Sequence, residues 1–484
     1  MIITVPVEID KTEVKDFHDL VETAFQTAMQ FGRELVRQAL EAMDGELRDG
    51  RDKTRYRCKG KKNTSVKTKL GEVEYRRYIY EDKAVTEGVR HVCLLDKEVA
   101  IDKVGMMAPD LCLLIAGTVC ENSYRGTAKA ITEATGQSIS PQGVWNVVQE
   151  LGKQRQEQID RHVELNEAHQ GTGCIKSRLL YEENDGIWLK MQGKDRKEYG
   201  TSKEMKVGIA YDGARWEGGK DGKRRRTLDN KIAHASFEQA KDFHKSKEGI
   251  IASRFDVNAI EVRMTNGDGA GWTQQSAGKN NLPVLDTFHR NKKLRECVRD
   301  GKMIKVLQEL LYSGKIQELL DCIEAYSNSV ETEEERARLQ ELLTYYRENK
   351  DAMTNCYERG IEIPETREPG VIHHARLGSM ESNVFTLIGN RMKDRRACWS
   401  VSGAGNLANL LCLRHTTGFE DLYALPPLPS REQEEEMDFG APLSASKTPE
   451  TVGKGSECYK RATLPNLPWL KAITSFVSFS NLHL

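Results

Sequence analysis

The sequence lacks the short motifs by which many nucleotide-binding and hydrolytic enzymes are identified. It contains no G-x-x-x-x-G-K-[ST] phosphate loop, no H-E-x-x-H zinc site and no G-x-S-x-G nucleophile turn. Its 11 cysteines form no C-x-x-C pair, and their odd number argues against a disulfide framework. The best membrane candidate, "LCLLIAGTVC" at 111–120, is too short to span a bilayer, and the first residues do not form a secretory signal. We therefore expect a cytoplasmic protein with reduced thiols and no membrane partner.

A large net charge is also missing, because 72 Lys and Arg residues against 73 Asp and Glu residues leave a net charge of −1. Basic residues are nevertheless clustered at 51–77, 218–226 and 390–399. Local basic patches on a neutral protein are typical of a polyanion bound at defined places, although a solvated surface would explain each cluster taken singly. In the first cluster, four side chains are expected to contact DNA: Lys61, Lys62, Arg76 and Arg77.

Hydrophobic periodicity predicts an α/β protein of several domains, as the length of 484 residues also suggests. Strand-like and helical segments alternate between 178 and 298, with "RTLDNKIAHASF" at 226–237 as the third strand, which is typical of a mixed sheet. By contrast, 303–358 has a wholly helical pattern. The expected organisation is an N-terminal helix at 1–50, a DNA-binding region at 51–170, a first core segment at 171–300, a helical insertion at 301–360, a second core segment at 361–425, and a linker with a tail at 426–484.

Residues 123–152 have the pattern of a helix-turn-helix. One helix is predicted to end near Gly136, and a second to begin after Ser140 as its N-cap. Apolar residues at helical spacing would turn one side of the second helix inward, so that its polar side faces outward as in a recognition helix, although many helical hairpins share this form. Four side chains of this segment are expected to contact DNA: Arg125, Gln142, Trp145 and Asn146.

Three acidic residues stand out by their positions. Asp185 lies in the strand-like run "LLYEENDGIWLKM", where a carboxylate needs a partner or a metal. Asp268 follows another strand in "TNGDGAGW", and Glu381 lies in the first turn of a predicted helix, "GSMESNV". Ordinary turn chemistry and a favourable acid at a helix start would explain the last two singly. Together, the three carboxylates would repel one another unless divalent cations balanced them, and the glycines around Asp268 would clear space for metal and a phosphodiester.

Oxygen-only ligands suit Mg²⁺ or Mn²⁺, and two such ions about 4 Å apart promote phosphoryl transfer. Four segments together resemble the transposases of ISLre-type bacterial insertion sequences: "ENDGIWLKMQG", "TNGDGAGW", "DTFHRNKKL" and "GSMESNVFTLIGNRMKDRRACWSVSGAGNLANLL". The upstream "RCKGKKNTSVKTKLGEVEYRRYIY" is also similar to the N-terminal region of that family, so the resemblance covers roughly residues 50–425. This is a DDE family, distantly similar to the Mutator-like transposases.

The resemblance implies an RNase H-like catalytic core with an all-α insertion, preceded by a mainly α DNA-binding region with a helix-turn-helix. It also implies that Asp185, Asp268 and Glu381 form the catalytic triad and hold two Mg²⁺ or Mn²⁺ ions. Three residues fall in the motif after the glutamate, where the ends of the DNA would be contacted: Arg391, Lys393 and Trp399.

The implied function is the transposition of an insertion sequence. The protein would bind the terminal inverted repeats of its element, cleave them with metal-activated water and join the freed ends to target DNA, acting as at least a dimer on DNA. Two alternatives remain open: an RNase H-like nuclease or resolvase that does not join strands, and a DNA-binding regulator with an inactive core.

Overall fold

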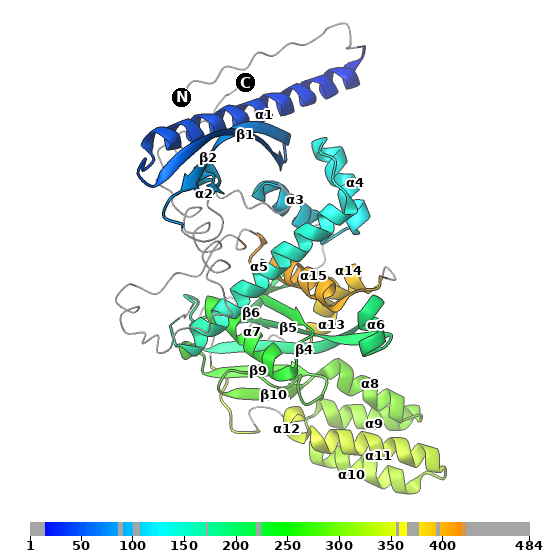
Figure 1. Cartoon of the computed structure of the whole chain (residues 1–484). Coiled ribbons are helices and arrows are strands. Elements are labelled where there is room, and N and C mark those ends of the chain that lie inside the picture. The colour runs from blue at the N-terminus through cyan, green and yellow to red at the C-terminus, as the bar shows by residue number, and fades with distance from the viewer. Residues whose placement is uncertain are drawn as a thin grey trace. The chain divides into compact units, whose positions relative to one another are not determined.

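The computed structural model describes residues 15–85, 91–99, 107–170, 173–218, 224–354, 358–364, 377–393, 397–419 and 422. The expected linker and tail at 426–484 lie outside these residues. The chain divides into two compact units, residues 1–150 with 419–484 and residues 151–418. Figure 1 shows the helices and strands of both units.

The first unit begins with a long helix that packs on a three-stranded antiparallel sheet. Its elements are helix α1 (Phe17–Gly50), strands β1 (Tyr56–Thr68), β2 (Gly71–Asp82) and β3 (His91–Val92), and helix α2 (Leu94–Glu98). The predicted N-terminal helix is confirmed from Phe17 to Gly50, and the basic segment at 51–77 covers β1 and the first part of β2 in one hairpin. Leu40 and Met43 on one face of α1 are buried with Val73 and Tyr75 of β2, because alternate residues of a strand face the same side.

Three further helices follow: α3 (Pro109–Val119), α4 (Tyr124–Thr135) and α5 (Pro141–Glu167). Gly136 ends α4 in the left-handed conformation, with φ 65°, as glycine readily does. The Ser140 hydroxyl accepts a hydrogen bond from the Gly143 backbone N–H at 3.0 Å. Both predicted helix ends are therefore confirmed.

The predicted inward face of α5 is buried, as shown by Val144, Val147, Val148 and Leu151. Helix α5 continues beyond the predicted end because its apolar periodicity continues through the buried Ile159. The apolar run at 111–120 lies mostly in α3, whose side chains are largely buried. Among the described residues, no helix combines the length and the apolar character that crossing a bilayer requires.

The second unit contains a five-stranded mixed sheet. Its strands are β4 (Leu179–Lys190), β5 (Ser202–Tyr211), β8 (Ile232–Ser236), β9 (Val262–Gly267) and β10 (Asn281–Leu285). They lie in the order β10-β9-β4-β5-β8. The pairs β4–β5 and β5–β8 are antiparallel, whereas β4–β9 and β9–β10 are parallel. The predicted mixed α/β core is therefore confirmed.

The run "RTLDNKIAHASF" at 226–237, predicted as one strand, is divided between two sheets. Its first part belongs to a separate hairpin of β6 (Gly213–Gly218) and β7 (Arg224–Asp229), and its second part is β8. Asn230 lies between them with φ 49°, a left-handed conformation that asparagine tolerates better than most residues. The prediction of a single strand was wrong because this turn residue was overlooked.

Helices lie between the strands of the sheet in the sequence and after the last of them. They are α6 (Gly193–Tyr199), α7 (Ala240–Arg254), the short 3-10 helix at Val257–Ala259, α8 (Thr287–Cys297) and α15 (Val401–Arg414). Helices α7 and α15 both pack against β8, and α7 also contacts β5. The sequence "SGAGNLA" lies within α15, so its glycines do not form a nucleotide-binding loop.

The helical pattern predicted at 303–358 is confirmed as far as Met353, as a bundle that lies in the sequence between α8 and the helix that carries Glu381. It contains α9 (Gly301–Tyr312), α10 (Ile316–Ser329), α11 (Glu333–Glu348) and α12 (Lys350–Met353). These helices share an apolar core with α8, including the fully buried Leu294, Leu307, Leu319 and Leu339. The chain then forms α13 (Met380–Val384), a π-helical segment (Phe385–Gly389) and α14 (Asn390–Met392) without interruption.

Candidate active site

Asp185 and Asp268 are brought together by the register of two parallel strands. Glu183 of β4 lies opposite Asn266 of β9, and each of the two aspartates follows two residues later. Neighbouring strands are about 4.8 Å apart, and side chains two residues apart lie on the same face. The two carboxylates therefore lie on adjacent strands at the place where β9 ends.

A third aspartate follows the next parallel strand. Leu285 of β10 lies opposite Gly267 of β9, and Asp286 donates its backbone N–H to the Gly267 carbonyl oxygen at 2.8 Å. The Asp286 side chain also forms the N-cap of α8, because its Oδ1 accepts the backbone N–H groups of Phe288 and His289 at 3.0 Å each. The carboxyl ends of β9 and β10 thus each present an aspartate beside Asp185.

Glu381 reaches the same pocket from a helix. It lies in the first turn of α13, which packs against β4 and β5. The three predicted acids all line one pocket, in which they are joined by Asp286 and His289. The structure therefore brings Asp185, Asp268 and Glu381 to one place and adds an acid and a histidine that the sequence analysis did not include.

The charges in this pocket influence one another. Burial raises the pKa of Asp185, a hydrogen bond and His289 lower it, and the Asp268 and Asp286 carboxylates raise it again, so that it lies above its usual value. A hydrogen bond to Asp286, with His289 Nδ1 3.1 Å from Oδ1, raises the pKa of His289 together with the nearby aspartates, against the effect of burial. Burial alone would raise the pKa of Asp286, but hydrogen bonds from His289 and Asn266 outweigh burial and lower it. The pocket is thus rich in negative charge and contains one histidine that favours its cationic form.

Hydrogen bonds within its own loop hold the Asp268 side chain. Its Oδ1 accepts the Thr273 hydroxyl and the Ala270 backbone N–H, each at 2.9 Å. The Asp268 carbonyl oxygen accepts the Tyr345 hydroxyl of α11 at 2.6 Å, so the helical insertion also supports this loop. The loop is therefore anchored through both its side chain and its backbone.

Two of the glycines beside Asp268 leave room for neighbouring side chains of the protein itself. A Cβ added at Gly267 would lie 2.4 Å from Thr273 Oγ1, which is too close for any larger residue. Gly269 has φ 95°, and a Cβ there would lie 2.9 Å from the Tyr345 ring. The expectation that these glycines clear space for metal and a phosphodiester is therefore wrong for Gly267 and Gly269, whereas a Cβ at Gly271 would have no neighbour within 4 Å.

A buried carboxylate two residues before Asp185 fixes the start of the Glu381 helix. Glu183 is fully buried and accepts the backbone N–H groups of Gly378 and Ser379, at 2.8 and 3.1 Å. Its carboxylate also accepts the Tyr211 hydroxyl at 2.7 Å and the Asn266 side-chain amide at 2.9 Å. Glu183 therefore connects β4, β5 and β9 to the residues that precede α13.

Asn266 extends this connection to the third strand end. The same Nδ2 group that donates to Glu183 also donates to Asp286 Oδ2, at 3.0 Å. A single buried amide thus bridges two carboxylates, and it can do so because an amide nitrogen has two hydrogens to donate.

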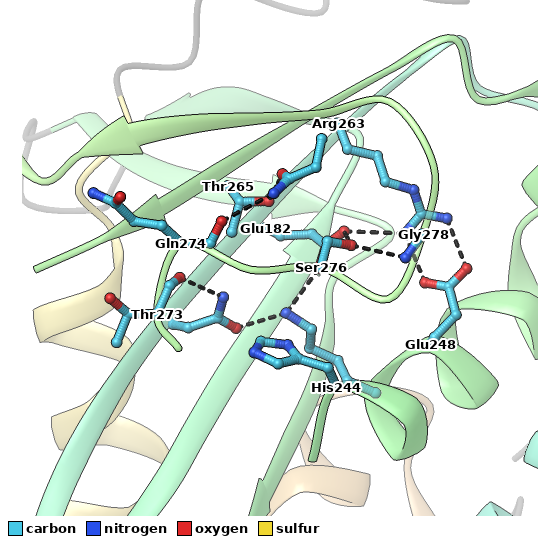
Figure 2. Close-up of polar contacts among 12 residues, drawn as sticks. Glu182, His244, Glu248, Arg263, Thr265, Thr273, Gln274, Ser276 and Gly278 are labelled. Carbon is cyan, nitrogen blue, oxygen red and sulfur yellow. Dashed lines mark hydrogen bonds and ion pairs between the residues drawn. The ribbon is translucent and has the colours of Figure 1, made fainter. Parts of the chain in front are cut away.

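On the opposite face of β4, Glu182 lies at the centre of a buried ionic network (Figure 2). Its carboxylate pairs with Lys247 Nζ at 2.7 Å and with Arg263 Nη1 at 3.0 Å, and it accepts the Ser276 hydroxyl at 2.8 Å. Arg263 also forms a bidentate ion pair with Glu248, at 2.6 and 2.8 Å. Successive residues of a strand face opposite sides, so Glu182 and Glu183 serve different sides of the sheet.

The ionic network reaches the Asp268 loop through Asn184. Lys247 Nζ donates to Asn184 Oδ1 at 2.6 Å, and Asn184 Nδ2 donates to the Thr273 carbonyl oxygen at 2.8 Å. Thr273 is the residue whose hydroxyl holds Asp268. The loop also passes close to the guanidinium group, since a Cβ at Gly278 would lie 2.0 Å from Arg263 Cζ.

The donor chemistry of the pocket fits a hard divalent cation. Its acids offer carboxylate oxygens, which Mg²⁺ and Mn²⁺ prefer. Burial, and to a smaller extent the carboxylates of Asp268 and Asp286, raise the pKa of Asp185, and a bound cation would favour its ionised form. Within the described residues, no three His, Cys, Asp or Glu side chains are grouped closely enough to hold one metal ion. The pocket therefore supplies suitable ligands without a formed coordination shell.

The residues predicted to contact DNA differ in their exposure. Those that are exposed are Lys61, Lys62, Arg76, Arg125, Gln142, Trp145, Asn146 and Lys393. Arg77 is instead buried and forms an ion pair with Asp96. Arg391 and Trp399 are also buried and pack on each other, with the guanidinium carbon 5.5 Å from the ring centroid. Their burial argues against direct DNA contact by Arg77, Arg391 and Trp399. These side chains contact other parts of the protein instead.

Asp286 and His289 were missed although the sequence carries a signal for them. The run "LPVLDTFH" repeats the pattern of Asp268, in which an aspartate directly follows a short apolar strand. Glu183 could not be separated from its acidic neighbours in "YEEND", because the sequence does not show which of them faces the pocket.

Comparison with known proteins gives a consistent family assignment. The profile described as "Uncharacterised protein family (UPF0236)" matches residues 11–420. A UPF0236 protein of Caldanaerobacter subterraneus subsp. tengcongensis is 22% identical over 371 residues, which cover 75% of this chain and 74% of the relative. A second protein of that bacterium, also 22% identical over 371 residues, covers 75% of this chain and 73% of its own length, and its name joins eleven locus designations. The "UPF0236 protein in vanSb 3'region" of Streptococcus gallolyticus is 20% identical over 394 residues, 80% of each chain.

Proposed function

The chain belongs to the uncharacterised protein family UPF0236, and we propose that it is a DDE transposase of a bacterial insertion sequence. The observation that carries the proposal is the convergence of Asp185, Asp268 and Glu381 on one pocket at the end of a mixed sheet. Acidic side chains at this position would hold the divalent cations with which the protein cleaves DNA at the ends of the element and joins those ends to target DNA.

The strand arrangement supports an RNase H-like core. Three consecutive antiparallel strands, β4, β5 and β8, are followed after α7 by β9 and β10, which add in parallel on the other side of β4. This is the arrangement that an RNase H-like core requires, with the first acid on the central strand. A related protein whose name joins eleven locus designations also supports the proposal, because a mobile element leaves many copies of its gene in one genome.

Asp185, Asp268 and Glu381 would hold two divalent cations, which supply an activated water nucleophile and stabilise the leaving oxygen when bound. His289 favours its cationic form beside Asp185 and would donate a charge-assisted hydrogen bond to a phosphate oxygen of the bound DNA. Glu183 and Asn266 would keep the acids in place, since they link the strands that carry two acids to the start of the helix that carries the third.

The first unit would bind the terminal repeats. Lys61, Lys62 and Arg76 are exposed on the β1–β2 hairpin and would neutralise phosphates. Gln142 and Asn146 are exposed near the start of α5 and hydrogen-bonded to each other at 3.0 Å, so they could read base edges once separated by DNA. Coordinated action on two ends of one element would require at least two copies of the protein on DNA.

The decisive experiment replaces each acid by its neutral isostere in the full-length protein. Asp185→Asn, Asp268→Asn and Glu381→Gln should each lower Mg²⁺-dependent nicking of a plasmid that carries the element ends by at least about 100-fold, because each removes one metal-binding charge. Binding of the ends, measured by electrophoretic mobility shift, should be retained. Glu331→Gln removes an equal charge from an exposed site in the insertion and should leave nicking unchanged. Full nicking by any of the three variants would remove that residue from the triad.

A strand-transfer assay with the same DNA ends separates transposition from its alternatives. A transposase joins a pre-cleaved end, with its free 3′-hydroxyl, to an unrelated plasmid, whereas a nuclease or resolvase of similar fold releases cut ends without joining them. A DNA-binding regulator would shift the ends in a gel and neither cut nor join them. Inverted repeats and a short direct duplication around the reading frame would identify the ends to be used.

A further inference from the structure

The first half of α1 carries large apolar side chains that the described part of the chain leaves exposed. Phe17 is 78% exposed, Val21 51%, Phe31 42% and Leu35 39%. Monomeric proteins expose single apolar residues often, but a continuous apolar face of this kind usually marks an interaction surface.

The spacing of these residues identifies the shape of the partner. The exposed positions Phe17, Val21, Ala24, Ala28, Phe31 and Leu35 follow one another at alternating steps of four and three. A hydrophobic repeat of 3.5 residues is the pattern by which two α-helices pack along each other in a coiled coil. We call these six positions the α1 seam.

The α1 seam is distinct from the face that packs on the hairpin. Leu40, on the packed face, lies nine residues after Phe31, which corresponds to a rotation of about 180° around an α-helix. Phe31 therefore points away from the sheet on which α1 rests, and Leu35, about 40° from Phe31 around the helix, lies on the same side. The sheet satisfies one side of the helix and leaves the other side for a partner.

We propose that the α1 seam binds the α1 seam of a second copy of this chain, so that the protein dimerises through a two-helix coiled coil without DNA. The positions that flank the seam suit self-association, because they carry no run of like charge that would repel an identical helix. From residue 18 to 32 these flanking residues are His18, Leu20, Phe25, Thr27 and Gly32.

The exposed apolar area is of the size that a small specific interface buries. Phe17 is 78% exposed and Phe31 42%, so the four rings of two copies would bury roughly 360–600 Å², given about 150–250 Å² for a whole aromatic side chain. Val21, Leu35, Leu20 and Phe25 are 39–51% exposed and would bring the total toward the roughly 1,200 Å² of a specific interface. A dimer formed in this way would provide the two copies that coordinated cleavage requires, but the surface is inferred independently of the proposed chemistry.

The test is sedimentation velocity of the full-length protein without DNA, across a wide range of concentrations. The native chain should be a dimer. Leu35→Glu should raise its dissociation constant by about 100-fold or more, because the dimer would bury two unpaired charges. Gln30→Glu introduces the same charge on an exposed position of α1 outside the seam and should change the constant by about threefold at most.

Three results would overturn the proposal: a native chain that is monomeric throughout, a Leu35→Glu variant that dimerises as tightly as the native chain, or equal weakening by Gln30→Glu. A monomeric native chain that Leu35→Glu destabilises in denaturant would show that another part of the same chain covers the α1 seam. Failure of dimerisation would leave the nicking results untouched, because nicking by the triad variants is measured separately.

Discussion

Two adjacent buried glutamates on β4 have partners of different charge. Glu182 is surrounded by Lys247 and Arg263, and these cations outweigh the effect of burial and lower its pKa to about 2. Glu183, one residue later and on the other face, is held by four neutral donors. The ionic side fixes the loop that bears Asp268, whereas the neutral side keeps negative charge unbalanced near the pocket, where a cation would be attracted.

The largest effect is expected when the ionic side loses its shared cation. Arg263→Met should lower the free energy of unfolding by about 3–5 kcal/mol, because Glu182 and Glu248 would remain buried with one partner fewer. Urea denaturation of the full-length protein measures this change. The burial of Glu248 already raises its pKa even with Arg263 present, so the two acids depend unequally on the same guanidinium group.

Arg178→Met is the matched control for this prediction. Arg178 forms a bidentate ion pair with Glu261 at 2.6 and 2.8 Å, but both side chains are more than half exposed. Its loss should cost less than about 1 kcal/mol, as for most surface ion pairs. Similar losses for Arg178→Met and Arg263→Met would show that burial does not distinguish the two pairs.

A smaller effect on stability is expected from the neutral side. Glu183→Gln keeps the shape of the side chain but replaces one acceptor oxygen by a donor that faces other donors, and should cost about 2–3 kcal/mol. Under the proposed function, the nicking rate should fall by more than the increase in unfolded protein explains. The reason is that the start of the Glu381 helix loses its anchor. Nicking at the native rate by a folded Glu183→Gln variant would show that this anchor does not position Glu381.

The smallest expected effect concerns acid sensitivity near the ionic side. Burial and the nearby Lys247 lower the pKa of His244 from 6.5 to about 4, so the folded protein resists its protonation. The unfolded chain takes up this proton near pH 6.5, and stability should therefore fall as the pH decreases from about 6.5 to 4.

His244→Asn removes the titrating group and can retain a hydrogen bond to the Trp272 carbonyl oxygen. The loss of unfolding free energy between pH 6.5 and 4 should be about 1–2 kcal/mol smaller in this variant than in the native chain. Urea denaturation at a series of pH values measures the difference. Parallel pH profiles for the two proteins would contradict a buried neutral His244.

Much of the fold follows from local sequence patterns. The helix ends at Gly136 and Ser140 were predictable because caps depend on one or two residues. The division of the strand run at Asn230 was not predicted, because asparagine is only one of several residues that can end a strand. The order of the strands in the sheet depends on pairing between distant segments, which periodicity does not encode.

The candidate site was predictable only in part. Asp185 and Asp268 could be chosen because each lies in or after a strand, and Asp286 could have been chosen by the same pattern. The roles of Glu183 and Asn266 could not be predicted, since they depend on donors contributed by residues far away in the sequence, such as Tyr211 and Gly378. For Arg391, charge was visible in the sequence but burial was not.

The hydrogen bond from Tyr345 to the Asp268 carbonyl oxygen has a consequence for inheritance. The helical insertion and the glycine-rich loop are separated by many residues, yet Gly269 leaves room for the tyrosine ring only because it has no side chain. A recombination event that exchanged one segment without the other would join a loop to an insertion with which it had not evolved. We expect viable hybrids between distant relatives to carry the two segments from the same parent.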